Sequence, residues 1–365
     1  VHYRVTKNLA VPKGVTLTIK PGAVLKFEDG TGLSVSTVFK GGYLDEENSG
    51  KLIMQGTPDS LIVFDGDEKQ IKLLLGESLF SIEESIPIEY VLFKNVIVEN
   101  ENFFGGYYLK NCVFDNYQSI WFPSLNCWSE KCNYLNVYVH FNNYIYGLKE
   151  CNISAFSSDQ SYYYYYYYDN LRNYFEGNNY LTPVNYYNKF DVYLWSDHSS
   201  PTTVTFEHPS YWGASKESIV RRYVWDIEKG QGFGYFDLSN MLKRPNKEAH
   251  GCVWKVVVDG YDAQDDFNEM PPLGVGRHKF EVFYNRDDMD TTTTPTITMG
   301  LQEPYTQTAI NQDGFWSVQD SVSVYTAFLD IDGKMTIDGL NRIAVTGAKD
   351  HDHFDVPTEN FRFNV

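Results

Sequence analysis

The chain has 365 residues, of which 42% are hydrophobic and 16% aromatic, which is enough for a sizeable core and for two domains. Its 48 acidic and 30 basic residues give a formal net charge of -18. That charge argues against nucleic acid and anionic membrane surfaces as partners, because both bind Lys and Arg. No apolar run approaches the roughly 20 residues that span a bilayer, so we expect no direct membrane insertion.

Short apolar runs separated by turn signals open the chain. The runs cover residues 17–19, 23–27, 33–35, 52–54 and 61–64, and Pro-Gly, Asp-Gly and Gly-Thr-Pro interrupt them. Each run has the length and the β-branched composition of a strand, and the turns recur too often to leave room for crossover helices. This pattern predicts the first coils of a right-handed parallel β-helix, a solenoid whose apolar side chains point inward.

A repeat containing cysteine follows between residues 88 and 156. Cys112, Cys132 and Cys151 occupy matching positions in LKNCVFDN, SEKCNYLN and LKECNISA, and they are separated by 20 and then 19 residues. Val96 takes the same position in FKNVIVEN. A period of about 20 residues is typical of one solenoid coil, in which equivalent side chains stack on one another. We therefore expect a column of buried, reduced cysteines, with Asn95 and Asn111 in the turns just before it.

A tyrosine-rich segment occupies residues 162–211 and includes seven consecutive tyrosines at 162–168. Alternate side chains of a strand face opposite sides, so about half of these tyrosines should lie on the outer surface. One interpretation is an aromatic platform on which the sugar rings of a polysaccharide or surface glycan stack. The alternative is a tyrosine-rich outer sheet with solvated hydroxyls. The candidate ligand-binding residues are Tyr162, Tyr164, Tyr166, Tyr168, Trp195 and Trp212.

The pattern changes again after a Pro- and Gly-containing stretch at residues 199–218. Longer alternating runs then predict strands at residues 219–227, 252–258, 278–284, 296–299, 322–329, 342–346 and 361–365. Strands at this spacing, joined by Gly-, Pro- and Asp-rich loops, favour a two-sheet β-sandwich. The sequence thus predicts an all-β chain with a β-helix over residues 1–212 and a sandwich over residues 213–365, the sandwich capping the last coil end-on.

Two sets of motifs resemble known protein families. PPLGVGRHKFEVFYNRDDMD (271–290), TPTITMG (294–300) and GLNRIAVTGAKD (339–350) resemble the Ig-like modules of bacterial surface proteins. GVTLTIKPGAVLKF (14–27) and KLIMQGT (51–57) resemble the opening coils of right-handed β-helix proteins. Together they resemble large multi-module secreted proteins of the Bacteroidetes type. The resemblance implies a scaffold, because such modules usually act as spacers or stabilisers.

Parallel β-helices also carry polysaccharide lyases and glycoside hydrolases, so repeated charged residues are candidate catalytic groups. Lys94, Lys110, Lys131 and Lys149 recur among the polar positions of the repeat, and such a lysine row suits a lyase, an acidic glycan or a solvated face. Residues 350–355 (DHDHFD) contain metal-ligand types, but a solvated loop is the simpler interpretation. We expect neither a metal nor a cofactor, and no nucleotide-binding or hydrolase motif is present.

These observations favour a non-catalytic extracellular or cell-surface module of a larger bacterial protein. Its expected roles are display, adhesion or glycan contact, alongside other modules of the same polypeptide. The alternative is a polysaccharide lyase or glycoside hydrolase that acts in a groove of the β-helix.

Overall fold

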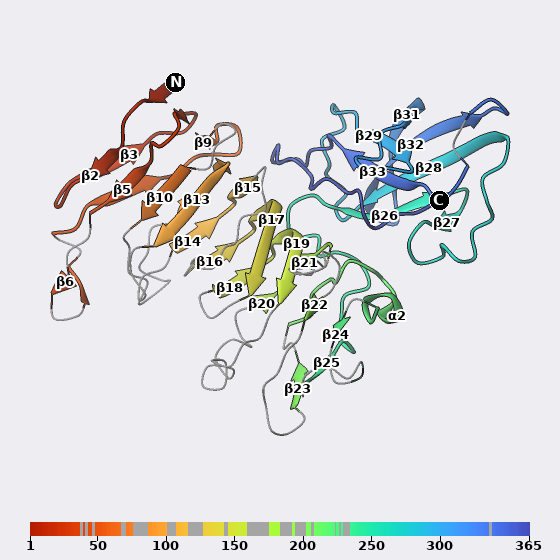
Figure 1. Ribbon diagram of the computed structural model, residues 1–365, viewed down its shortest axis with the longest axis horizontal. Coiled ribbons are helices and arrows are strands. Elements are labelled where there is room, and N and C mark those ends of the chain that lie inside the picture. Colours follow the sequence, from red (N-terminus) through yellow and green to blue (C-terminus); the bar gives the residue numbers. More distant parts are fainter. Residues whose placement is uncertain are drawn as a thin grey trace.

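A computed structural model describes most of the chain. The described residues are 1–36, 39–40, 43–45, 48–66, 71–75, 87–100, 107–115, 127–141, 145–158, 175–182, 192–193, 202–205, 208–222, 224–225, 228, 234–335 and 338–365. Apart from one short helix, the elements that they form are all strands, in a parallel part that begins at the N-terminus and an antiparallel part that ends at the C-terminus (Figure 1).

Three large parallel sheets account for most of the described strands of the parallel part. The long sheet has eight strands, in the order β1 (His2–Val5), β4 (Val24–Phe27), β9 (Ile62–Asp65), β12 (Val91–Lys94), β15 (Val113–Asp115), β17 (Asn133–Phe141), β19 (Asn152–Ser158) and β21 (Asn179–Tyr180). The second sheet has four, in the order β13 (Val96–Asn100), β10 (Ile71–Leu75), β5 (Leu33–Val35) and β2 (Leu9–Val11). The third has five, in the order β11 (Ile88–Glu89), β14 (Tyr107–Lys110), β16 (Cys127–Glu130), β18 (Ile145–Lys149) and β20 (Phe175–Glu176).

The chain visits these sheets in a recurring order. It passes from β11 in the third sheet to β12 in the long sheet and β13 in the second sheet, and then returns to β14 beside β11. Before them, β3 (Thr16–Ile19) pairs with β8 (Lys51–Met54), and a bridge from Gln55 to Glu89 connects β8 with the third sheet. Each passage adds one rung, which is consistent with a β-helix-like solenoid. All five strands expected before residue 65 are confirmed to within about two residues, since β3, β4, β5, β8 and β9 cover them.

One corner repeats at every rung where the third sheet leads into the long sheet. The corner residues all have left-handed backbone angles: φ is 53° at Tyr90, 50° at Asn111, 52° at Lys131, 53° at Glu150 and 61° at Gly177. Each of the first four donates its N–H to a carbonyl of the following rung, over 2.8 to 3.2 Å. The left-handed conformation costs a non-glycine residue about 1–2 kcal/mol, which these inter-rung bonds offset.

The residue after each corner points into the core. Cys112, Cys132 and Cys151 are fully buried and free, and the N–H groups of Cys112 and Cys132 each lie 3.4 Å from the sulfur of the next cysteine. The expected cysteine column is therefore confirmed. The assignment of Val96 to it was wrong, because Val96 pairs with Ile71 in the second sheet.

In the preceding rung, Val91 is the residue that stacks on Cys112. Leu92, which follows Val91, pairs with Val113, which follows Cys112. The error has a physical cause. Lys94-Asn95 and Lys110-Asn111 turn two different corners, and both corners need a residue with positive φ. The turns expected at Asn95 and Asn111 are confirmed by φ values of 53° and 50°.

An aromatic column runs beside the cysteines. The rings of Phe64, Phe93, Phe114 and Tyr134 follow one another at centroid distances of 5.7, 4.9 and 5.0 Å, and each is a register partner of the next. Burial of such rings contributes about 25 cal/mol per Å² of apolar surface, so this column is a principal source of stability for the parallel part.

Parallel pairing continues beyond residue 213, where we expected the sandwich to begin. β22 (Val192–Tyr193) pairs with β24 (Val224–Trp225), and β23 (Thr202–Thr205) pairs with β25 (Gly234–Asp237). The strand predicted at 219–227 was wrong, because helix α2 (Glu217–Val220) and the short β24 lie there. Ile219 and Val220 of α2 belong to the same apolar cluster as the solenoid core, and this packing overrides their β-propensity.

The antiparallel part begins at Val253. Five strands form one sheet in the order β27 (Tyr261–Asp262), β26 (Val253–Val258), β28 (Gly276–Tyr284), β32 (Val322–Ile331) and β31 (Gln312–Gln319). Three more, β30 (Thr308–Ile310), β29 (Thr296–Gly300) and β33 (Arg342–Thr346), form a second sheet. A separate apolar cluster unites residues of both sheets, among them Phe280 and Ile343, as in a β-sandwich. The strands expected at 252–258, 278–284, 296–299, 322–329 and 342–346 are confirmed, whereas residues 361–365 form only an isolated bridge.

Phe114→Ala should lower the free energy of unfolding by about 3–5 kcal/mol, because it opens a cavity in the fully buried aromatic column. Chemical denaturation followed by circular dichroism measures this change. Phe315→Ala is the matched control: Phe315 is 50% exposed, and its loss should change stability by no more than about 0.5 kcal/mol. Equal effects of the two substitutions would contradict a stabilising role for the column.

Candidate functional site

An asparagine ladder lies on the outer face of the long sheet. Asn133, Asn152 and Asn179 are register partners, and all three are fully buried. Asn152 donates from Nδ2 to Oδ1 of Asn133 over 3.0 Å, and Asn179 donates to Oδ1 of Asn152 over 2.8 Å. Cys151 and Ile153 flank Asn152 and belong to the solenoid core, so the amides point to the opposite face of the strand. Burial of these polar groups requires a cover that can form hydrogen bonds.

The junction loop, residues 246–251, supplies that cover. The N–H of Asn246 donates to Oδ1 of Asn179 over 2.7 Å, and Asn152 donates to the carbonyl of His250 over 2.8 Å. From the antiparallel part, Asn285 donates from Nδ2 to the carbonyls of Asn246 and His250, over 2.9 and 3.1 Å. The junction loop therefore connects the ladder to the residue that follows β28 by hydrogen bonds on both sides.

An apolar contact lies next to the ladder. Phe354 of the closing loop, residues 350–355, clusters with Val113 and Leu135 of the long sheet. Its ring also stacks on the imidazole of His250 at a centroid distance of 3.8 Å. These contacts place the antiparallel part against the side of the later rungs (Figure 1). The expected end-on arrangement is thus replaced by docking on the face of the long sheet.

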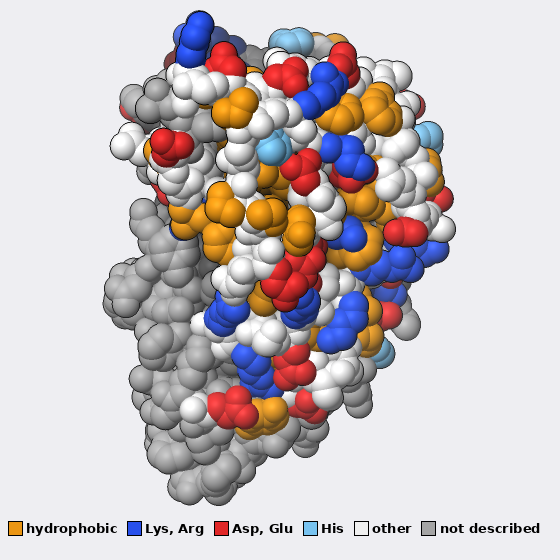
Figure 2. Space-filling model, turned by 90° about the vertical axis from the view of Figure 1, so that its right-hand side faces the viewer, with side chains coloured by type: hydrophobic (Ala, Val, Ile, Leu, Met, Phe, Trp, Pro, Cys, Tyr) orange, Lys and Arg blue, Asp and Glu red, His pale blue; other side chains and the backbone are white. Residues whose placement is uncertain are grey.

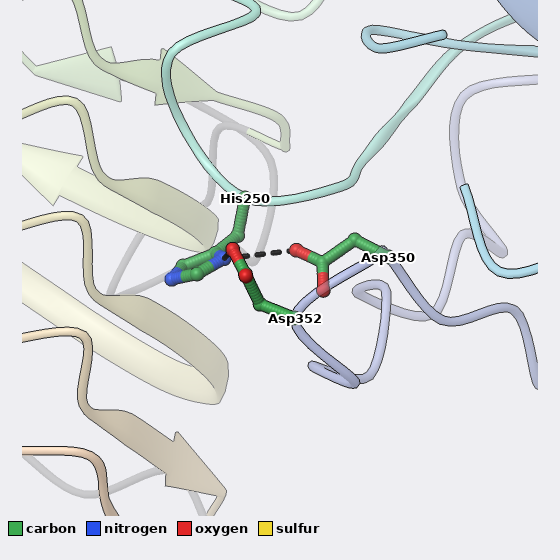
Figure 3. Close-up of side chains that lie close together, drawn as sticks. All are labelled: His250, Asp350 and Asp352. Atoms are coloured by element: carbon green, nitrogen blue, oxygen red, sulfur yellow. Dashed lines mark hydrogen bonds and ion pairs between the residues drawn. The ribbon is translucent and has the colours of Figure 1, made fainter. Parts of the chain in front are cut away.

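A histidine and two carboxylates meet where the two loops touch (Figure 3). Nδ1 of His250 lies 2.8 Å from Oδ2 of Asp350 and 4.0 Å from Oδ2 of Asp352. Asp350 also accepts the N–H groups of Gly251, over 3.1 Å, and Phe354, over 2.9 Å. Burial by itself would raise the pKa of Asp350, but the His250 ring and these N–H groups stabilise the carboxylate, and its pKa falls below the usual value.

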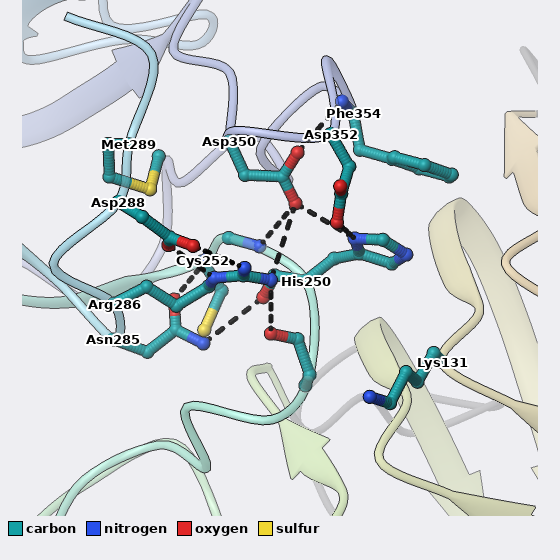
Figure 4. A network of polar contacts seen from close by, with 12 residues as sticks. Lys131, His250, Cys252, Asn285, Arg286, Asp288, Met289, Asp350, Asp352 and Phe354 are labelled. Atoms are coloured by element: carbon teal, nitrogen blue, oxygen red, sulfur yellow. Dashed lines mark hydrogen bonds and ion pairs between the residues drawn. The ribbon is translucent and has the colours of Figure 1, made fainter. Parts of the chain in front are cut away.

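Arg286 extends this cluster on the side of the antiparallel part (Figure 4). Its guanidinium binds Asp288 with two hydrogen bonds of 2.7 and 2.8 Å, and Nη1 lies 3.9 Å from Oδ2 of Asp350. Nη1 also donates to the carbonyl of Ala249 over 3.3 Å. The arginine therefore attaches the turn after β28 to the junction loop.

A second buried ion pair joins the two parts elsewhere. Arg362 binds both carboxylate oxygens of Glu359, at 3.0 and 2.7 Å, and donates to the carbonyl of Gly213 over 2.9 Å and to that of Val253 over 2.6 Å. It also donates to the hydroxyl of Tyr211 over 3.2 Å. Burial raises the pKa of the Glu359 carboxyl, and the adjacent guanidinium opposes that rise. One side chain thus connects residues next to β21, the last strand of the long sheet, with the first antiparallel strand.

The arrangement is chemically suited to structural bonding and to holding a cation. His250 is 3% exposed, which is too little for a substrate molecule to contact its imidazole. The ligand atoms of His250, Asp350 and Asp352 all lie within 4.8 Å of one another, and they are the types that hold a divalent metal ion.

Most of the predicted glycan-contact residues lie outside the described residues. This applies to Tyr162, Tyr164, Tyr166, Tyr168 and Trp195. Trp212 is described and is 8% exposed, and its ring stacks on Tyr180 at 4.4 Å. Trp212 is accordingly part of the core and has little surface on which a sugar could stack.

The repeated lysines do not form one row. Register partners along the third sheet alternate in charge, in the order Glu89, Lys110, Glu130, Lys149, Glu176. Lys94 lies in the long sheet between Asp65 and Asp115, and Lys131 turns the corner 3.5 Å from Glu150. Because the charges of successive rungs are opposite, they neutralise one another along the sheet.

The solvated loop expected at residues 350–355 is only partly correct. His353 and Asp355 are exposed, but Asp350 and Phe354 are buried. Sequence reasoning missed His250 and the ladder, since Asp350 lies 100 residues from His250 and no spacing motif connects them. Asn133 follows Cys132 and Asn152 follows Cys151, and this repeated Cys-Asn pair was the sequence signal that could have predicted the ladder.

Comparison of the chain with protein-family models, with curated proteins and with solved structures finds no match. Among the described residues, no helix is both long and apolar enough to cross a membrane.

Asn152→Ala should destabilise the protein by about 2–4 kcal/mol, because it removes one buried hydrogen bond each from Asn133, Asn179 and the His250 carbonyl. Faster amide hydrogen exchange in residues 246–251 should accompany the loss. Asn48→Ala, at an exposed asparagine, is the control and should leave both measurements unchanged. Unchanged exchange in the Asn152 variant would show that the ladder does not hold the junction loop.

Arg362→Met should cost about 3–5 kcal/mol, because the buried Glu359 then lacks its counter-charge. Combining it with Glu359→Gln removes that charge and should restore a large share of the stability. Thermal and denaturant unfolding of the single and double variants measure the coupling between the two residues. A double variant as unstable as Arg362→Met would contradict this account.

Proposed function

We propose that this chain is a non-catalytic module of a larger bacterial extracellular or cell-surface protein, serving display, adhesion or glycan contact. In this proposal a right-handed parallel β-helix carries an Ig-like β-sandwich on its flank. The observation that carries the proposal is the buried junction, in which the asparagine ladder, Phe354 and Arg362 fix the two parts together. A rigid connection of this kind suits a scaffold that holds a surface at a set distance and angle.

The distribution of charge also supports this proposal over a lyase or hydrolase. A lyase needs a free base together with groups that neutralise the sugar acid, and a hydrolase needs two converging carboxylates. Along the third sheet the lysines and glutamates are instead paired, with Nζ–Oε distances of 3.9 Å for Lys110–Glu130 and 3.7 Å for Lys149–Glu176. Figure 2 shows acidic and basic side chains interspersed over the face that it presents. Such mixed charge is typical of a solvated surface.

The tyrosine-rich segment remains the proposed contact surface for a polysaccharide or surface glycan. Stacking of sugar rings on tyrosine faces would supply affinity without catalysis. Other modules of the same polypeptide would place this surface outside the cell.

A glycan screen that records both binding and product release tests the proposal. We expect binding to a subset of plant, host or microbial polysaccharides, lost when Tyr162, Tyr164, Tyr166 and Tyr168 are all replaced by Ser. Tyr3→Ser, at a tyrosine that is 54% exposed on the first strand, is the control and should bind like the unaltered protein. Release of shortened or unsaturated sugars would overturn the proposal in favour of an enzyme. Binding that survives the fourfold substitution would exclude the tyrosine run as the contact surface.

A further inference from the structure

Two carboxylates converge on one edge of a buried imidazole at the junction. His250 comes from the junction loop, whereas Asp350 and Asp352 come from the closing loop, and Figure 3 shows both carboxylates on the Nδ1 side of the ring. The Asp350 oxygen is within hydrogen-bond distance of Nδ1, but the Asp352 oxygen, at 4.0 Å, is not. The other ring nitrogen, Nε2, is buried and has no hydrogen-bond partner in the described part of the chain. The polar environment of this ring is therefore concentrated at Nδ1.

The charges around that edge favour a cation. The nearest basic group is Arg286, whose guanidinium is engaged by Asp288 through two hydrogen bonds. Its Nη1 lies 3.9 Å from Oδ2 of Asp350, which is beyond hydrogen-bond distance, so two carboxylates and one guanidinium already held by Asp288 surround the imidazole. Asp350 is also shielded from water. Like charges at this separation repel each other strongly outside bulk water, and a divalent ion between them removes the repulsion.

The ligand groups are also held in position before any ion binds. Asp350 is fixed by the N–H groups of Gly251 and Phe354, and the Phe354 ring stacks on the His250 ring at an angle of 19°. Supporting contacts of this kind orient metal ligands and raise affinity. The side chain of Asp352 is 36% exposed, which leaves a route from solvent and room for water in the remaining coordination positions.

We propose that Nδ1 of His250 and the carboxylates of Asp350 and Asp352 bind one divalent transition-metal ion, Zn²⁺ being the ion that best suits them. One imidazole nitrogen and two carboxylate oxygens are a ligand set that Zn²⁺ accepts, and a water completes four-coordination. The ion would tie the junction loop to the closing loop and reinforce the attachment of the antiparallel part. This site departs from the expectation of no metal, and it does not depend on the proposed glycan contact.

Isothermal titration of EDTA-treated protein with ZnCl₂ tests the site. We expect one ion per chain, with affinity at least about tenfold weaker in Asp352→Asn. Asp355→Asn is the matched control, because that carboxylate lies in the same loop but pairs with Lys349 at 2.9 Å. A His351→Gln/His353→Gln variant controls for adventitious binding by the other two histidines of this loop, and should bind like the unaltered protein.

A second measurement separates binding from misfolding. Each variant is first compared in EDTA, where Asp352→Asn should unfold at nearly the same temperature as the unaltered protein. Zn²⁺ should then raise the Tm of the unaltered protein and of Asp355→Asn, but not that of Asp352→Asn. No saturable binding, equal binding by Asp352→Asn, or loss of binding only in the His351/His353 variant would each overturn the proposal.

Discussion

The fully buried amides of Asn133, Asn152 and Asn179 are the constraint on which the rest of this structure depends. A buried amide without partners costs about 1–3 kcal/mol, so three of them stacked on the outside of a sheet are tolerated only beneath a hydrogen-bonding cover. The junction loop provides the carbonyl and N–H groups, and its own position is fixed by Asn285, the residue that follows β28. Satisfying the ladder thus determines where the antiparallel part sits.

The same constraint brings otherwise unrelated groups together. Because the junction loop lies along the ladder, the side chain of His250 contacts the closing loop. There Phe354 stacks on the imidazole, and Asp350 accepts a hydrogen bond from Nδ1 of His250. The polar junction is therefore a consequence of how two β-structures were joined. The buried groups connect the junction loop with the closing loop and with the turn after β28.

The charges of the third sheet alternate in sign from rung to rung. Stacked rungs put equivalent residues close together along the sheet, so a row of like charges would be strongly unfavourable without a ligand. Alternation from Glu89 to Glu176 removes that cost. Inside, the same stacking is favourable, because identical apolar or aromatic side chains pack well on one another, as Phe93 and Phe114 do at 4.9 Å.

The sequence by itself determined the all-β character, the early strands, the cysteine column and most antiparallel strands. These features depend on local periodicity and on turn residues, and both can be recognised from residues close together in the sequence. Tertiary structure alone decided that Val91, and not Val96, stacks on Cys112. It also decided that parallel pairing continues to Asp237 and that the antiparallel part docks on the face of the long sheet. The contact between His250 and Asp350 was likewise decided by the tertiary structure. A contact between residues 100 positions apart depends on how the folded surfaces fit together, and no sequence periodicity predicts it.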